Sequence, residues 1–400
     1  MEDLLKQHFD QVDLDIRKKA PGYSRFMDQK VTPDVLSFIA DCVVNFLGGK
    51  EPHTTFVITD IWEFPYFIKN TVAIFGKPSP ENETTGSEYD KFIAQPLKTL
   101  AFAKILEEKK IGIKNTYTVL KPDILEYISR NERNALHFLV VYIEKVLSDS
   151  GFIDELESYM AKAAANTLSN EDFETLKNDF QIFMRGFTEI NGDTEINRIF
   201  PKVLNPYAAA YKIPGTEKGH MTPGRFIYSD LMYNRKNFRD IGKDKTVSRQ
   251  EMLREITELP EVVIYRVQKA KNIIKRHHAN SEVRDSLAIG EATQVHHIFP
   301  EHGFPEISDY LENLILLTPQ QHNTRAHPDN KTQTIGSEYQ KDCLLSKIDS
   351  IIASIRKGDN LYAKERFIHV INTGYNFNLS TNTSFEELKE IIRKRQTPSG

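Results

Sequence analysis

Three histidines and an asparagine between residues 294 and 327 have the types and the spacing of a hydrolytic metal site. His296 and His297 lie in one apolar run, Asn313 opens a second apolar run, and His322 follows nine positions after the asparagine. An imidazole is both a common ligand of divalent ions and a base that accepts a proton near neutral pH. A divalent ion beside such a base stabilises the charge that develops on a phosphate. This order of residues therefore predicts metal-dependent hydrolysis of a phosphodiester.

Two short strands and a helix must bring these side chains together. Residues 293–300 are rich in β-branched and apolar side chains and end at a proline, and residues 314–317 form a second apolar strand. Pro319 suits the first turn of a helix, which we expect to continue over residues 320–327. Because side chains alternate across a strand, His296 and His297 point in different directions. We therefore expect unlike roles for them, one toward a metal and one toward a water molecule.

The block of residues 294–327 resembles the HNH (ββα-metal) nuclease family, in a His-His-Ile form, through its order His-His, Asn, His. The resemblance covers this block alone. It implies that His297 is the general base that takes a proton from the attacking water, and that Asn313 fixes the loop that orients His297. It also implies that His296 and His322 are the metal ligands. A structural or degenerate copy of the motif is the alternative.

The cofactor that the resemblance implies is one divalent ion per active site, with Mg²⁺ as the first expectation. Magnesium prefers oxygen ligands, so phosphate and water would fill most of its shell. Two imidazoles also suit Mn²⁺, Ni²⁺ or Co²⁺, which we expect to substitute. His327, five residues after His322, is a candidate for a third ligand or a phosphate contact, although the family often has a ligand four residues on. Arg325 on the same helix is a candidate phosphate clamp, with a solvated arginine as the alternative.

Positive charge is concentrated just before the paired histidines. The chain has a net charge of −4, yet residues 201–290 carry 17 basic and 10 acidic groups. Basic and aromatic residues are mixed there, as in surfaces that contact a DNA backbone. A solvated charged surface is the alternative. The candidate DNA contacts are Arg235, Lys236, Arg239, Lys243, Lys245 and Arg325.

Hydrophobic periodicity predicts an α+β protein that is mostly helical. Residues 92–105 and 136–147 have helical spacing, and residues 111–120 between them are β-branched and aromatic with a Lys-Asn turn signal at Lys114-Asn115. Helix, hairpin and helix together resemble a winged-helix unit, in which the hairpin lysines would lie over phosphates and the helix around residues 64–75 would enter a groove. A small α+β domain with solvated lysines is the alternative.

Three parts follow from these patterns. Residues 1–160 are expected to form a DNA-recognition domain with winged-helix character, and residues 161–215 a helical linker region. Residues 216–400 are expected to form the catalytic domain, with the ββα-metal motif at 294–327. The second boundary depends on the run of turn-forming residues at 212–224.

Composition excludes several classes of protein. The chain has 400 residues, 40% hydrophobic and 27% charged, and no apolar run approaches the roughly 20 residues that span a bilayer. Its N-terminus lacks the order of a signal peptide. Two distant cysteines, Cys42 and Cys343, exclude a cysteine-ligated structural zinc and fit a reducing compartment. We therefore expect a cytoplasmic protein without a membrane partner.

The wider setting, including residues 231–240 and 297–301, resembles bacterial type II restriction endonucleases of the HNH class. That resemblance implies an enzyme that cuts both strands of double-stranded DNA at a short sequence, most simply as a homodimer on a palindrome. One alternative is a nuclease directed to methylated or hydroxymethylated cytosine, with an aromatic pocket for a flipped base. A non-catalytic DNA-binding regulator with a decayed nuclease module is another. The candidate pocket residues are Trp62, Phe64, Tyr66 and Phe67.

Overall fold

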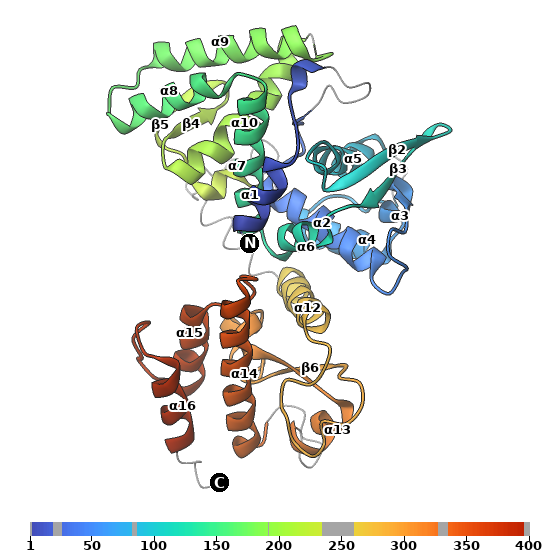
Figure 1. Ribbon diagram of the computed structural model, residues 1–400, viewed down its shortest axis with the longest axis vertical. Coiled ribbons are helices and arrows are strands. Elements are labelled where there is room, and N and C mark those ends of the chain that lie inside the picture. Colours follow the sequence, from blue (N-terminus) through green and yellow to red (C-terminus); the bar gives the residue numbers. More distant parts are fainter. Residues whose placement is uncertain are drawn as a thin grey trace. The chain divides into compact units, whose positions relative to one another are not determined.

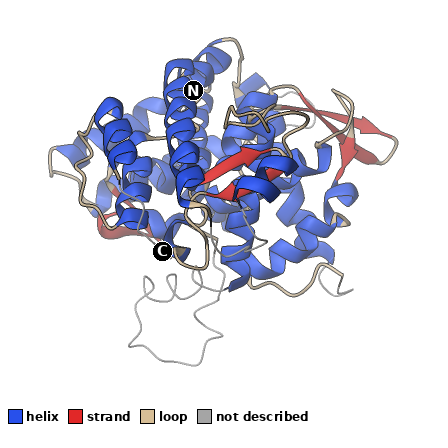
Figure 2. Cartoon of the chain, turned by 90° about the horizontal axis from the view of Figure 1, so that it is seen from below, coloured by secondary structure: helices blue, strands red, loops and turns tan. Residues whose placement is uncertain are grey.

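The chain divides into two compact units, Glu2–Glu255 and Ile256–Gly400. The structure, a computed structural model, describes residues 2–18, 26–81, 86–190, 192–233, 260–326 and 335–395. Helices predominate in both units and the strands form small sheets (Figures 1 and 2). The predicted α+β, mostly helical class is therefore confirmed.

Helices of the first unit are begun and ended by the residues that usually mark such ends. Proline occupies the first turn of α2, α4 and α6, where its missing N–H leaves no hydrogen bond unmade. Gly76 ends α4 with a φ of 58°, a conformation that costs glycine little. The helices are α1 (Glu2–Asp10), η1 (Ile16–Lys18), α2 (Pro33–Leu47), α3 (Ile58–Trp62), α4 (Pro65–Phe75), α5 (Gly86–Phe102), α6 (Pro122–Arg130), α7 (Glu132–Asp149), α8 (Ile153–Ala164), α9 (Asn170–Phe187), α10 (Asp193–Tyr211) and η3 (Tyr228–Leu231).

A three-stranded antiparallel sheet in the first unit has the order β1-β3-β2. Its strands are β1 (Phe56–Val57), β2 (Leu106–Ile111) and β3 (Lys114–Val119). The hairpin turn predicted at Lys114-Asn115 is wrong, because Lys114 already pairs with Ile111 and the turn is Gly112-Ile113. Gly112 has a φ of 63°, the conformation that the first position of a two-residue hairpin turn requires.

A second hairpin joins β4 (Pro214–Glu217) to β5 (His220–Arg225). It occupies the turn-rich residues 212–224, where the sequence suggested a domain boundary, and it lies inside the first unit. Lys218 and Gly219 form its turn with φ values of 52° and 86°. The Asn205 side chain on α10 exchanges hydrogen bonds of 2.9 and 2.8 Å with the backbone of Thr216, which anchors the hairpin to that helix.

The second unit surrounds a short hairpin with helices. Strand β7 (Leu314–Leu317) is buried at all four positions, so apolar side chains cover both of its faces. Its core partners come from Ile298 and Phe299 and from the apolar face of α14, which has the helical spacing that the sequence predicts. The elements are α12 (Pro260–His277), β6 (Gln294–His297), η4 (Pro305–Ile307), η5 (Leu311–Asn313), β7, α13 (Pro319–Gln321), η6 (His322–Ala326), α14 (Ser337–Lys357), α15 (Lys364–Tyr375) and α16 (Phe385–Lys394).

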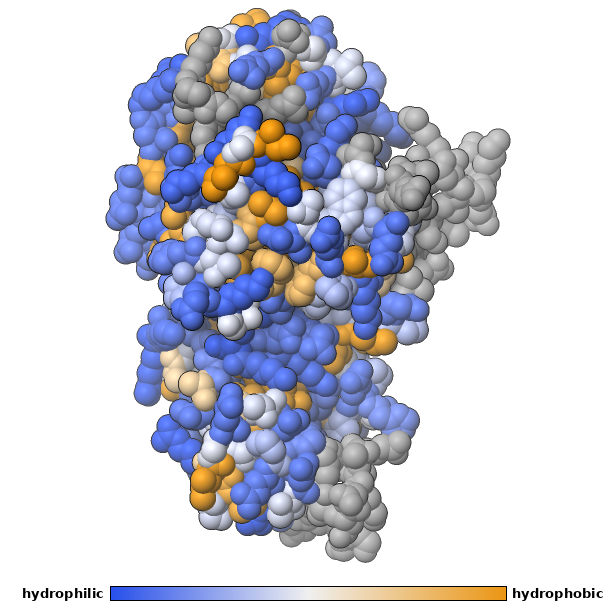
Figure 3. Space-filling model, turned by 90° about the vertical axis from the view of Figure 1, so that its right-hand side faces the viewer, coloured by the Kyte–Doolittle hydropathy of each residue, from blue (hydrophilic) through white to orange (hydrophobic). Residues whose placement is uncertain are grey.

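Hydrophilic side chains predominate on the face drawn in Figure 3, where hydrophobic ones occur in small groups. Within the described parts of the chain, no helix is both long and apolar enough to cross a bilayer.

Candidate active site

The paired histidines lie at the end of β6, next to the start of β7. In the antiparallel pairing, His296 lies opposite Ile315 and His297 lies opposite Leu314. Both imidazoles are buried, with 8% of each residue exposed. Because neighbours on a strand point to opposite faces, the two rings have different surroundings. His296 approaches His322, whereas His297 contacts the loop between the strands.

Backbone contact fixes the protonated nitrogen of His297. Its Nε2 lies 3.0 Å from the carbonyl oxygen of Ser308. A carbonyl oxygen only accepts hydrogen bonds, so Nε2 carries the proton in the neutral ring and Nδ1 keeps the lone pair. Burial, with a contribution from the positive charge of Lys271, lowers the pKa of His297 below 6.5, against the Ser308 hydrogen bond and the charge of Glu301. The ring is therefore neutral near pH 7, with Nδ1 able to accept a proton.

Asn313 holds both ends of the loop that contacts His297. Its Oδ1 accepts a 2.8 Å hydrogen bond from the Phe299 N–H. Its Nδ2 donates to the carbonyl oxygens of Phe299 at 3.0 Å and Ile307 at 3.1 Å. The asparagine is fully buried, so these bonds are protected from water. Ile307 directly precedes Ser308, and Asn313 therefore positions the carbonyl that orients His297.

His296 and His322 come together from β6 and from η6. Their ring centroids are 5.3 Å apart and their planes are nearly perpendicular. The start of the helical segment that carries His322 is fixed by the Thr318 hydroxyl, which accepts a hydrogen bond from the Gln321 N–H at 3.2 Å. His322 then opens η6, a π-helical turn. Such turns occur frequently at functional sites.

Segment 281–285 secures this helical start from the opposite side. The Gln321 amide donates to the Val283 carbonyl at 2.8 Å and to the Asp285 carboxylate at 2.9 Å, while its oxygen accepts from the Ser281 hydroxyl at 2.6 Å. Gln321 is fully buried. Three hydrogen bonds to segment 281–285, and a fourth of 3.0 Å from the Thr318 N–H, thus hold the side chain next to His322.

The separation of the His296 and His322 rings is compatible with two imidazoles that share one divalent ion. Two imidazoles that bind one ion at the usual Zn–N length of about 2.1 Å have ring centroids roughly 5 Å apart, and the observed separation is 5.3 Å. Within the described ranges, no group of three or more His, Cys, Asp or Glu side chains converges to hold an ion. An ion held by these two side chains would take its other ligands from water and phosphate oxygens, which Mg²⁺ and Mn²⁺ accept.

Of the other predicted site residues, the structure describes Arg325 alone. Arg325 is exposed on η6, and its charge acts on Asp342 of α14. His327 and the basic residues Arg235, Lys236, Arg239, Lys243 and Lys245 lie outside the residues that the structure describes.

Sequence reasoning missed two charges close to His297 and a buried ion pair behind β7. The charge of Lys271 on α12 lowers the pKa of His297, and the charge of Glu301 after β6 raises it. The basic residues that precede the motif in the sequence could have indicated Lys271. Glu282 and Lys347 pair at 2.6 Å with side chains 1% and 0% exposed. Glu282 also accepts a 2.9 Å hydrogen bond from the Leu316 N–H, so the pair supports β7. No local periodicity signals such a long-range contact.

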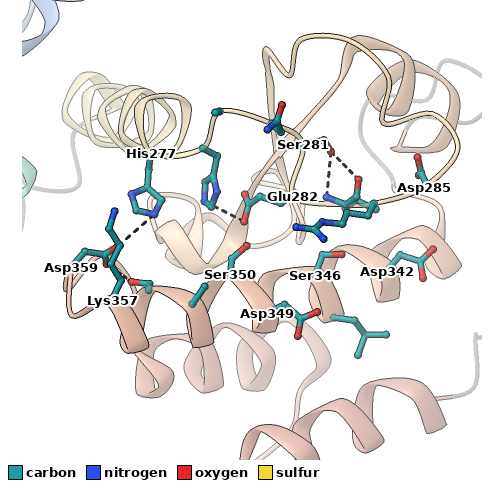
Figure 4. Close-up of a pocket in the computed structure, with 18 residues that line it drawn as sticks. His277, Ser281, Glu282, Asp285, Asp342, Ser346, Asp349, Ser350, Lys357 and Asp359 are labelled. Atoms are coloured by element: carbon teal, nitrogen blue, oxygen red, sulfur yellow. Dashed lines mark hydrogen bonds and ion pairs between the residues drawn. The ribbon is translucent and has the colours of Figure 1, made fainter.

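A polar cleft of about 760 Å³ lies between segment 277–285 and α14. Figure 4 shows His277 directed toward Asp359, and Ser346, Asp349 and Ser350 along the α14 wall. His278, on the wall formed by segment 277–285, contacts the Tyr362 hydroxyl at 2.7 Å. None of the four motif residues lines this cleft. The second histidine pair thus belongs to a different surface from His296 and His297.

The aromatic residues considered for a flipped base pack within the first unit. Phe67 is fully buried, and Phe64 lies edge-on to Phe46 at 5.7 Å between ring centroids. The Trp62 indole N–H donates to the Pro80 carbonyl at 3.1 Å. The Tyr66 hydroxyl donates to Asp41 at 2.7 Å. Packing and hydrogen bonds within the unit account for all four side chains.

Comparisons of this chain with models of known protein families, with curated proteins and with solved structures found no match. Its chemistry is therefore inferred from the residues themselves.

Proposed function

We propose that this protein is a metal-dependent endonuclease that cuts double-stranded DNA at specific sites, as the nuclease of a restriction system. The supporting observation is the contact from His297 Nε2 to the Ser308 carbonyl, which leaves Nδ1 as a base. His296, the neighbour of His297 in β6, lies 5.3 Å from His322 between ring centroids, and this pair has the donor chemistry of a divalent-ion site. A base and a ligand pair are the components that phosphodiester hydrolysis requires.

Each of the four motif residues has a separate role in the proposed hydrolysis. His297 Nδ1 accepts the proton of the attacking water, and the lowered pKa keeps that nitrogen unprotonated near pH 7. Asn313 keeps the ring in place by holding the carbonyl next to Ser308. His296 and His322 would hold one divalent ion, most simply Mg²⁺, which stabilises negative charge on the phosphate and on the leaving 3′ oxygen.

Recognition of DNA is assigned in this proposal to the first unit. Its order α2-β1-α3-α4-α5-β2-β3, with the sheet order β1-β3-β2, supports the resemblance to a winged-helix unit. In this arrangement the helix directly before the hairpin is α5 rather than α4. The basic residues from Arg235 to Lys245 would add contacts to the DNA backbone.

A homodimer is the simplest assembly for cutting both strands of a palindrome. Each copy would supply one His297-centred site and one recognition unit. Such an enzyme acts on DNA inside a bacterial cell, so the cytoplasm is its proposed location.

A digest of genomic DNA tests the proposal. Purified protein is incubated with methylated and with unmethylated genomic DNA and Mg²⁺, and the fragments are separated by size. We expect discrete fragments from at least one of the two DNAs and none when a chelator replaces Mg²⁺. DNA that stays intact in both forms with Mg²⁺, Mn²⁺, Ni²⁺ and Co²⁺ would overturn the proposal. Cutting of methylated DNA alone would assign the modification-directed alternative.

A further inference from the structure

The tip of the β2–β3 hairpin exposes two isoleucines among lysines. Ile113 is 93% exposed and Ile111 is 65% exposed. Lys109, Lys110 and Lys114 beside them are exposed as well. In Figure 1 this hairpin extends away from the helices of the first unit. Hairpin turns usually carry glycine, asparagine, aspartate or serine, so an isoleucine at this position calls for an explanation outside the fold.

The register of the hairpin separates an inner from an outer face. Tyr117 lies opposite Glu108 and is fully buried, so this face packs on the unit. Ile111 pairs with Lys114, and these two side chains share the other face because side chains alternate along a strand. Ile113 follows in the turn itself. Folding of the first unit therefore leaves both isoleucines in solvent.

Charge at the tip is one-sided. Residues 109–114 contain three lysines and no acidic residue. Lys109 pairs with Glu107 at 2.9 Å. Among the residues that the structure describes, no carboxylate forms an ion pair with Lys110 or Lys114. Two lysines are thus available at the tip for an anionic partner.

The helices around the hairpin offer little surface for reading DNA. In α5 the exposed side chains among those described are Asp90, Lys91 and Lys98. In α4 they are Pro65, Lys69 and Val72. A recognition helix needs several polar side chains that reach base edges. The hairpin tip is the part of this sheet and its neighbouring helices with a dense positive charge and free apolar groups.

We propose that the tip of the β2–β3 hairpin enters the minor groove of duplex DNA, with Ile113 as an apolar wedge against a base step. Lys110 and Lys114 contact phosphates on the two sides of the groove. Proteins that bend DNA insert isoleucine and similar side chains between base steps in this way, flanked by basic residues. The two-residue turn suits a groove about 6 Å wide, whereas a complete two-stranded ribbon needs the major groove. This inference rests on the proposed action on DNA and names the contact that the first unit makes.

A lipid surface has the same general chemistry, but the tip fits it less well. Stable attachment of a protein to a membrane needs a large apolar surface or two separate anchoring signals. Two isoleucines on one turn supply little area, and Gly112 between them adds no side chain. Vesicle binding is therefore treated as a contrary outcome.

Binding of the full-length chain to a labelled DNA duplex tests the inference. Fluorescence anisotropy is measured over a range of NaCl concentrations with EDTA present, so that the DNA is not cut. We expect Ile113→Ser to weaken binding about tenfold, the effect of losing one good contact, with the salt dependence unchanged. The double variant Lys110→Ala, Lys114→Ala should lower the slope of log affinity against log salt by about 1.8, because each phosphate contact contributes about 0.9.

Matched controls remove another exposed isoleucine and another exposed lysine of the same unit. Ile182 on α9 is 66% exposed, and Lys6 on α1 is exposed. Ile182→Ser and Lys6→Ala should bind DNA as the wild type does. Thermal unfolding followed by circular dichroism shows that every variant is folded.

The outcomes separate this inference from the proposed function. If the wild type cuts DNA while the hairpin variants bind it as the wild type does, the hairpin inference is wrong and the nuclease proposal stands. If the wild type neither binds nor cuts DNA, both fail. Ile113-dependent binding to vesicles of phosphatidylcholine and phosphatidylserine, without binding to the duplex, would also overturn the inference.

Discussion

His297 and Asn313 are connected through two consecutive carbonyl groups of one loop. The imidazole contacts the Ser308 oxygen at 3.0 Å, and the Asn313 amide donates to the Ile307 oxygen at 3.1 Å. Movement of either carbonyl would therefore move the other. The orientation of the proposed base thus depends on a buried side chain that never contacts the substrate.

Replacement of Asn313 should reduce both stability and cleavage. Asn313→Ala leaves the N–H and carbonyl of Phe299 and the Ile307 carbonyl without their partner. Each buried polar group that loses its bond costs about 1–3 kcal/mol, so the loss of three bonds should lower the free energy of unfolding by at least about 3 kcal/mol. Hydrogen exchange of peptides from the second unit measures this change in stability. Tryptophan fluorescence would not, because the single tryptophan, Trp62, is in the first unit. Asn382→Ala at an exposed position is the control. Exchange equal to the wild type in Asn313→Ala would contradict the positioning role.

The ion pair behind β7 should couple strongly in a double-mutant cycle. Lys347→Met leaves the Glu282 carboxylate buried without its cation, and breaking such a pair costs about 3–5 kcal/mol. The double variant Glu282→Gln, Lys347→Met removes both charges and should lose less stability than the sum of the single changes. Hydrogen exchange of residues 314–317 reports the free energy of opening. Additive effects would show that the two side chains act independently.

Stability of the second unit should decrease as the pH falls from 6.5 toward 4. Burial lowers the pKa of His278 to about 4, whereas the unfolded chain binds the proton near 6.5. Above pH 6.5 both states are neutral and the shift has no effect. Between these values the unfolded state gains a proton that the folded state does not, which destabilises the fold by up to about 3 kcal/mol. His278→Gln should flatten this part of the curve, measured by hydrogen exchange at pH 7 and pH 5 with back-correction for the intrinsic rate. An equal pH dependence in both proteins would argue against it.

Gly374 should tolerate no larger side chain. A Cβ atom at this position of α15 would lie 2.3 Å from ring atoms of Phe299, far closer than carbon atoms approach. Phe299 is buried and its backbone is bonded to Asn313, so the ring cannot move freely. Gly374→Ala should therefore destabilise the second unit, although alanine favours helices. Gly358→Ala is not a suitable control, because Gly358 has a positive φ that alanine adopts only with strain. Gly186→Ala on α9, where a Cβ meets nothing, is the matched control. A thermal midpoint above that of the wild type in Gly374→Ala would refute this packing argument.

Local chemistry explains which parts of the fold could be predicted from sequence. Pro319 at a helix start and the apolar runs beside His296 and Asn313 are signals within a few residues, and the strands and helix lie where these signals indicate. The sequence predicts a hairpin over residues 111–120 that turns at Lys114-Asn115, whereas the observed hairpin covers residues 106–119 and turns at Gly112-Ile113, because glycine readily adopts the positive φ of that turn.

Contacts distant in sequence were not predictable in this way. The carbonyls that Asn313 holds are set by the conformation of the whole loop 298–312, and no single residue type signals it. The Glu282–Lys347 pair joins residues 65 positions apart. The two isoleucines of the hairpin tip could not be recognised as a candidate binding surface from the sequence, because their exposure is known only from the structure.

The most direct test of the central claim compares DNA cleavage with DNA binding in His297→Ala. Single-turnover cleavage of a plasmid with Mg²⁺ gives the rate of the chemical step, and anisotropy in EDTA gives the affinity. His302→Ala, an exposed histidine of the same loop, is the control. Loss of a general base should slow cleavage by about 10²–10⁴-fold while affinity and fold stay as in the wild type and His302→Ala stays active. Cleavage by His297→Ala at the wild-type rate would contradict the assignment of His297 as the base.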